Sequence, residues 1–148
     1  MPGQEGFGKQ FNVVPIAAGV GLSLRGASAV AFVCTNTVTA AVFTITCAPT
    51  FGGTYVAPTS SGGIITHYYQ STAVNGSAAF TKVTQAAANA VTVTGTGLTT
   101  VIEVLGVMLP DPNVYVKCTN SGGAGLVMAV LHDLTVQRAP ANLALVGA

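Results

Sequence analysis

The sequence has few charged residues and no tryptophan. Its 148 residues include five basic and four acidic side chains, so charged residues make up 6% of the chain, against about 25% in ordinary soluble domains. The formal net charge of +1 offers no attraction to nucleic acid or to an anionic membrane. A near-neutral chain with so few charges needs either a hydroxyl-rich surface or a surface covered by partners.

Long apolar runs are also missing. The best candidate, residues 101–109, is too short for a transmembrane helix and contains Glu103. The start of the chain, MPGQEGFGKQF, lacks the basic and apolar regions of a signal peptide. We therefore expect no membrane association and synthesis in a reducing cytoplasm.

Three cysteines fit a reducing compartment, because an odd number cannot all pair within one chain. We expect Cys34, Cys47 and Cys118 to be small buried hydrophobic residues. A cross-strand disulfide between Cys34 and Cys47 is the alternative.

The residues needed for catalysis or metal binding are scarce. The only histidines are His67 and His132, and neither belongs to an HxxxH or CxxC pattern, so no metal site is expected. A triad of a serine, His132 and Asp111 lacks the GxSxG elbow, and adjacent His132 and Asp133 should point to opposite faces of a strand. Four carboxylates are few for glycoside hydrolysis. The sequence predicts no enzyme, no catalytic residue, no metal and no cofactor.

Short runs with a period of two dominate what is present. Residues 41–47, AVFTITC, alternate apolar and polar side chains, as a half-buried strand does. Pro15 should restrict its strand to a sheet edge, Gly106 should introduce a bulge, and residues 85–89 favour a single helical turn. The spacing of strands and turns predicts an all-β antiparallel sandwich, either jelly-roll-like or Ig-like. Strands are expected at residues 13–18, 29–35, 41–47, 51–56, 64–69, 79–85, 90–94, 99–109, 113–119 and 126–131.

Residues 113–136 are predicted to form a central hairpin around a glycine-rich turn at 121–125. Its second strand is apolar at every position from 126 to 131, so both faces should be covered. One face carries Leu126, Met128 and Val130, and the other carries Val127, Ala129 and Leu131. A single sandwich core covers one face, so the chain is expected to associate with other copies of itself.

The chain ends are predicted to be extended arms, residues 1–12 and 137–148, around a domain at residues 13–136. Their apolar groups would be exposed unless the arms dock on a neighbour. The predicted interface residues are Phe7, Phe11, Val127, Leu131, Leu143 and Leu145.

The chain resembles head decoration (cement) proteins of tailed bacteriophages. The resemblance rests on the composition rich in Ala, Gly, Thr and Val, the arm MPGQEGFGKQF, the segment NVYVKCTNSGGAGLVMAVLHDL and the tail APANLALVGA. It implies a β-rich structural protein on the capsid exterior of the virion, often a homotrimer, that binds the major capsid protein and stabilises the head.

Two other functions remain open from the sequence. Tail-tube and fibre-associated β domains of phages share this composition. A secreted carbohydrate-binding sandwich could use Tyr55, Tyr68 and Tyr69 as a stacking platform, although the absence of tryptophan counts against it.

Overall fold

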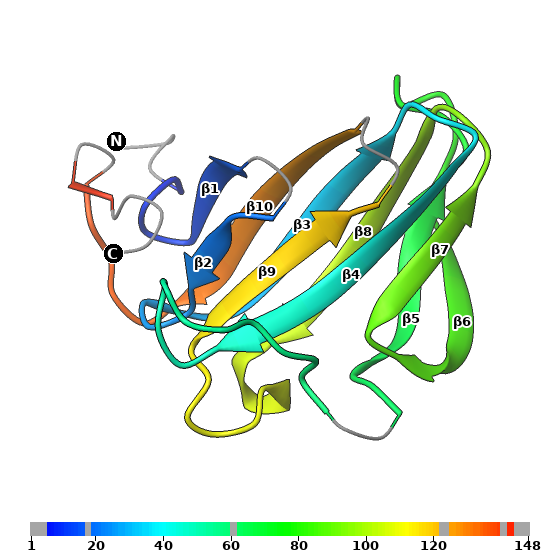
Figure 1. The fold of residues 1–148 in the computed structure, drawn as a ribbon. Helices are drawn as coiled ribbons and strands as arrows, with labels where there is room; N and C mark the ends of the chain where they lie inside the picture. The colour runs from blue at the N-terminus through cyan, green and yellow to red at the C-terminus, as the bar shows by residue number, and fades with distance from the viewer. Residues whose placement is uncertain (1–5, 17–18, 60–61, 122–124, 140–141, 144–148) are drawn as a thin grey trace, which may run out of the picture.

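A computed structural model describes residues 6–16, 19–59, 62–121, 125–139 and 142–143. In this part of the chain, ten β-strands form two antiparallel sheets packed face to face (Figure 1). The prediction of an all-β antiparallel sandwich is confirmed. The strands are β1 (Phe11–Ile16), β2 (Gly21–Ser23), β3 (Ala27–Asn36), β4 (Ala40–Ala48), β5 (Ile65–Ser71), β6 (Thr81–Ala88), β7 (Ala90–Thr94), β8 (Leu98–Leu105), β9 (Tyr115–Asn120) and β10 (Gly125–Leu134).

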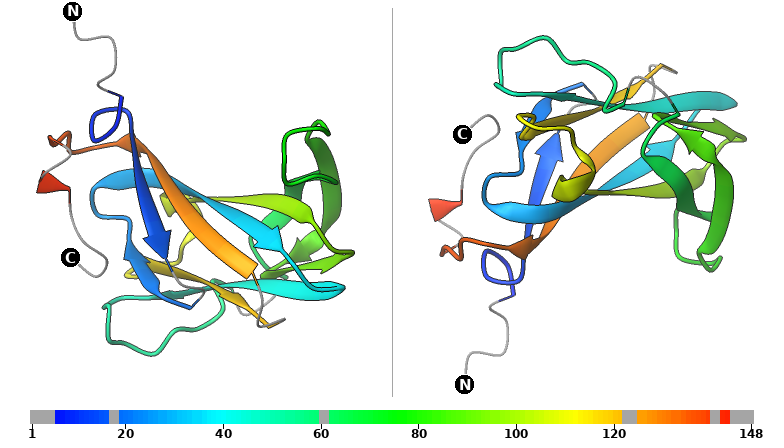
Figure 2. Two further views of the ribbon diagram at one scale, coloured as in Figure 1. Left: turned by 90° about the horizontal axis from the view of Figure 1, so that it is seen from above. Right: turned by 90° about the horizontal axis from the view of Figure 1, so that it is seen from below.

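The strand order identifies the architecture as a jelly roll. Sheet A has the order β1-β10-β3-β8-β5-β6, and sheet B has the order β2-β9-β4-β7. Without β5 and β6, successive strands alternate between the sheets except at β4 and β7, which are neighbours in sheet B. Strand β1 pairs with β10, β2 with β9, β3 with β8 and β4 with β7. This is a long folded hairpin rolled into two layers. The hairpin β5–β6 is inserted between β4 and β7 and extends sheet A beyond β8 (Figure 2).

The predicted central hairpin at residues 113–136 is wrong. Strand β9 lies in sheet B between β2 and β4, whereas β10 lies in sheet A between β1 and β3. The two strands therefore belong to different sheets and do not pair with each other. Each strand carries an apolar row that must be buried, and the sandwich buries both rows by facing them across the core.

Three local predictions also need correction. Residues 85–88, expected in a helical turn, belong to β6, which continues past a register shift to pair Ala88 with Ile65 of β5. Residues 51–56 form a loop attached by one bridge between Val56 and Cys47. Strand β8 ends at Leu105 and continues as a 3₁₀ turn, η1 (Gly106–Met108), in place of a bulge. The described residues contain no helix that could cross a membrane.

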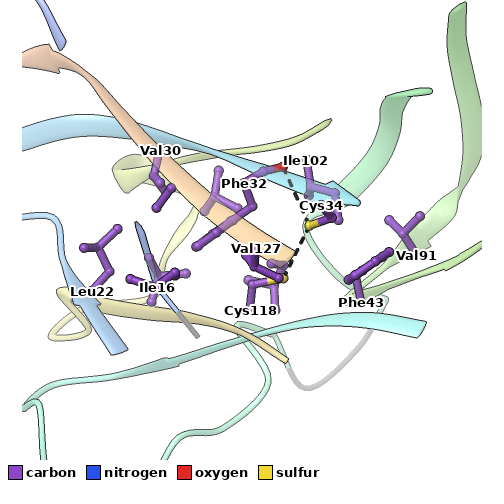
Figure 3. Close-up of a cluster of buried hydrophobic side chains, with 14 of the residues drawn as sticks. Ile16, Leu22, Val30, Phe32, Cys34, Phe43, Val91, Ile102, Cys118 and Val127 are labelled. Atoms are coloured by element: carbon purple, nitrogen blue, oxygen red, sulfur yellow. Dashed lines mark hydrogen bonds between the residues drawn. The ribbon is translucent and has the colours of Figure 1, made fainter. Parts of the chain in front are cut away.

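The core lies between the two inner faces (Figure 3). Phe32 and Ile102 from sheet A and Phe43 and Val91 from sheet B are fully buried there. Burial of each such side chain contributes about 1.5–3 kcal/mol to stability.

All three cysteines are buried and free, as predicted, and the alternative Cys34–Cys47 disulfide is absent. The Cys34 thiol instead faces Cys118 of the opposite sheet, with the sulfurs 4.0 Å apart (Figure 3). The hydrogen bond to Cys118 and burial raise the pKa of Cys34. Burial likewise raises the pKa of Cys47.

The described parts of the two chain ends lie against each other. The Arg138 amide donates a hydrogen bond to the Gly8 carbonyl (2.8 Å), and Phe7 packs on Phe11 with ring centroids 6.1 Å apart. Strand β1 begins at Phe11 and pairs it with His132. Phe11 and Asn12 therefore belong to the sandwich, and the predicted arm boundary at residue 12 is two residues too late.

Candidate interaction surface on sheet A

In strand β10, the row that contains Val127 and Leu131 faces the core. Val127 and Leu131 are buried between the sheets, so their assignment to an intermolecular interface is wrong. The outward row is the other one: Leu126 is 79% exposed and Met128 44% exposed. Both rows are apolar in the sequence, so alternation alone could not decide between them.

The outward row continues sideways across the sheet. Met128 lies beside Pro15 of β1 on one side and Val33 of β3 on the other. Val33 pairs in turn with Val101 of β8, and Val101 with Tyr69 of β5. These five residues, Pro15, Met128, Val33, Val101 and Tyr69, form what we call the apolar row. Four strand spacings of about 4.8 Å make it roughly 19 Å long.

A second line of outward residues lies next to the apolar row. It runs from Val13 through Val130 and Ala31 to Glu103. Three of these four side chains are apolar, so the apolar surface is at least two residues deep along the strands. Sequence reasoning missed the row because its members come from five strands, and only the register brings them together.

Charged groups collect at one border of this surface. The two ring nitrogens of His132 each lie 3.0 Å from a carboxylate oxygen, Nε2 from Glu103 and Nδ1 from Asp133. Asp133 has a φ of 52°, and this bend turns its side chain toward its neighbour. The expectation that His132 and Asp133 point to opposite faces is therefore wrong.

This cluster is not arranged as a nucleophilic triad. A catalytic histidine needs one ring nitrogen directed at the nucleophile, and carboxylates take both nitrogens of His132. Within the described residues, no group of three His, Cys, Asp or Glu side chains could hold a metal ion. The cluster acts as a charged border to the apolar surface.

The proposed sugar-stacking platform does not assemble. Tyr69 faces outward on sheet A, 40% exposed, whereas Tyr68 points into the core. Tyr55 lies on the other side of the molecule, where its ring covers the Lys117 ammonium of sheet B at 4.0 Å. The three rings therefore cannot contact one sugar together.

The other predicted interface residues have mixed positions. Phe7 and Phe11 are partly exposed at the edge of sheet A, and Leu143 is half-buried against the sandwich. Leu145 lies outside the described residues. Phe11 lies in β1 on the same outward side as Val13 and Pro15, so it extends the apolar surface toward the chain ends.

Comparison of the chain with protein-family models, with curated proteins and with solved structures gives no match. The resemblance to phage head decoration proteins rests on the sequence features alone and stays a hypothesis.

Proposed function

We propose that this chain is a non-enzymatic structural protein that associates with copies of itself through the outer face of sheet A. The apolar row carries the proposal: it places apolar side chains from five adjacent strands on one solvent-facing surface. Apolar patches of this kind on soluble proteins usually mark interaction sites.

The size and charge of the surface suit a second copy of the chain. A standard interface buries about 800 Å² on each partner, and a row of roughly 19 Å fits within such a patch. Acidic groups border the surface at Glu103 and Asp133, and Lys82 lies beside Tyr69 at its far side. Association of copies through this surface can place the lysine of one copy near the carboxylates of the next.

The setting proposed for this assembly is the exterior of a bacteriophage head, as the resemblance implies. There a trimer would bind the major capsid protein and reinforce the shell. Charge depletion is typical of the buried centre of interfaces, and it extends over this whole chain. A tail-tube or fibre-associated domain would use the same self-association in another part of the virion.

The decisive experiment compares the solution mass of the wild type with that of Met128→Asp by analytical ultracentrifugation. A charge in the middle of the apolar row should weaken association by at least about 2 kcal/mol, roughly 30-fold in the dissociation constant. Thr44→Asp is the matched control, because Thr44 faces outward on sheet B.

A monomeric wild type at micromolar concentration would contradict the proposal, as would equal masses for wild type and Met128→Asp. Co-sedimentation with empty phage heads then tests the setting. Binding that Met128→Asp and the wild type share would place the capsid contact on another face.

A further inference from the structure

A cavity of about 290 Å³ opens beside the edge strands β1 and β2. These strands lie at the end of the sandwich remote from the β5–β6 hairpin (Figure 1). The cavity lies where the edge strands of the two sheets, β1 and β2, come together with the residues after β10. These edges are not paired with each other, so the two layers stay open here. The cavity is separate from the apolar row, whose side chains point away from the core.

The interior of the cavity is mostly apolar. Val14 of β1, Leu22 of β2 and Leu131 of β10 line it, and all three belong to the buried core. Leu134, the last residue of β10, and Leu143 add further walls. Small-molecule sites usually have volumes of about 300–1,000 Å³ with largely apolar walls, so this cavity fits a small apolar group.

Asn12 adds a polar side chain to this lining. Asn12 is only 8% exposed and lies on the inward face of β1, in phase with Val14 and Ile16. Its side-chain amide has no hydrogen-bond partner among the residues that the structure describes. The amide is not among the atoms that are closed off from solvent without a partner, so it faces the open cavity and can form a hydrogen bond with a polar group that enters it.

Two arginines give the cavity a positive rim. Arg25 and Arg138 both line it and are exposed, and the cavity lining includes no carboxylate from the described residues. The Arg25 guanidinium lies 5.6 Å from the centroid of the Tyr115 ring. The Arg138 backbone is tied to Gly8. Guanidinium groups bind carboxylates with paired hydrogen bonds.

We propose that this cavity binds a small amphiphile with a short apolar chain and one anionic head, such as a medium-chain carboxylate. The head lies between Arg25 and Arg138 and accepts a hydrogen bond from the Asn12 amide. The apolar chain extends over Leu22 and Leu131. This function is independent of self-association through sheet A.

Isothermal titration of the full chain with decanoate tests the proposal, with decanol as the uncharged probe of equal length. Decanoate should bind saturably and at least tenfold more tightly than decanol. Arg25→Gln and Arg138→Gln should each weaken decanoate binding about fivefold to tenfold, and both residues are exposed, so folding is preserved. Lys117→Gln removes a cation that does not line the cavity and should leave decanoate binding unchanged.

Asn12→Asp sharpens the test, because it keeps the shape of the side chain and adds a negative charge that repels the head group. It should weaken decanoate binding more than tenfold and leave decanol binding unchanged. Absence of saturable decanoate binding would overturn the proposal. Equal affinity for decanoate and decanol, or wild-type affinity in both arginine variants, would also overturn it.

Discussion

The outer faces of the two sheets differ although both sheets share one core. On sheet A the outward positions of the central strands are mainly apolar, as in the apolar row. On sheet B the corresponding positions are mainly threonines and one lysine: Thr44 and Thr46 of β4, Thr92 and Thr94 of β7, and Lys117 and Thr119 of β9. Threonine suits a strand and can keep its hydroxyl in water; Thr46 is the exception, since its hydroxyl oxygen is buried. The outer face of sheet B is therefore mainly polar and suits contact with solvent, whereas the outer face of sheet A is mainly apolar and suits contact with another protein surface.

Sheet B also supplies a cover for the few large side chains on its outer face. The loop after β4 places Phe51 on Tyr115, with centroids 6.2 Å apart, and Tyr55 on Lys117. The Tyr55 hydroxyl donates to the Phe51 carbonyl and lies against Gly21, where a Cβ would collide with it. No such loop covers the apolar row among the described residues. The missing layer on sheet A is what a second copy would provide.

The largest expected effect separates the inner row of β10 from its outer row. Val127→Asp places a charge in the core, where it has no partner, and should cost more than about 4 kcal/mol, enough to prevent folding. Met128→Asp, one residue away, should fold with wild-type circular dichroism and fail only in assembly. Thermal unfolding of both variants checks this. Equal loss of stability in both would mean that the two rows are not divided between core and surface.

A substitution at Gly21 can displace the loop after β4 that covers the outer face of sheet B. A methyl group there pushes the Tyr55 ring away, so Gly21→Ala should lower the free energy of unfolding by about 1–3 kcal/mol, as overpacking does. In a Tyr55→Ala background the same change should cost almost nothing, because the clash is gone. Urea denaturation of the four proteins measures this coupling. An equal cost of Gly21→Ala in both backgrounds would show that the ring is not the obstacle.

The cysteine thiols allow the exclusion of water to be compared between the two inner faces. Cys34 belongs to sheet A and Cys47 to sheet B. Their pKa values are raised above the ordinary 9.0, so the folded thiols keep protons that the unfolded chain loses. The stabilisation that the protonated thiols give the folded state is complete below pH 9. It is lost as the pH rises toward and through the pKa values of the folded thiols. Each thiol should then lower the unfolding free energy by up to about 1.4 kcal/mol per pH unit.

Urea denaturation between pH 8 and 10 in a reducing buffer measures that slope. Cys34→Ala and Cys47→Ala should each flatten it, and the double variant should flatten it further. A slope that survives in the double variant would assign the alkaline loss to other groups.

Much of the sandwich could be predicted from alternation within single strands. Residues 90–94 were predicted with the observed bounds, and the edge position of Pro15 is confirmed. The pairing could not be predicted, because an apolar run beside a glycine-rich link suits a hairpin and a crossing between sheets equally. The choice between Met128 and Val127 as the surface residue failed for a related reason. Both rows of β10 are apolar, and only the packed partner sheet determines which one is inside.

The smallest expected effect comes from two substitutions of outward residues, one that makes a polar residue of sheet B apolar and one that makes an apolar residue of sheet A polar. Thr92→Val leaves shape and β-propensity almost unchanged at an exposed site, so stability should change by less than about 0.5 kcal/mol and the solution mass should not change. Val101→Thr in the apolar row buries a hydroxyl at the proposed interface and should weaken association by about 1 kcal/mol, roughly fivefold. Sedimentation over a concentration series resolves a change of this size. If Thr92→Val promotes association while Val101→Thr leaves it unchanged, then sheet B, and not sheet A, is the face that meets the second copy.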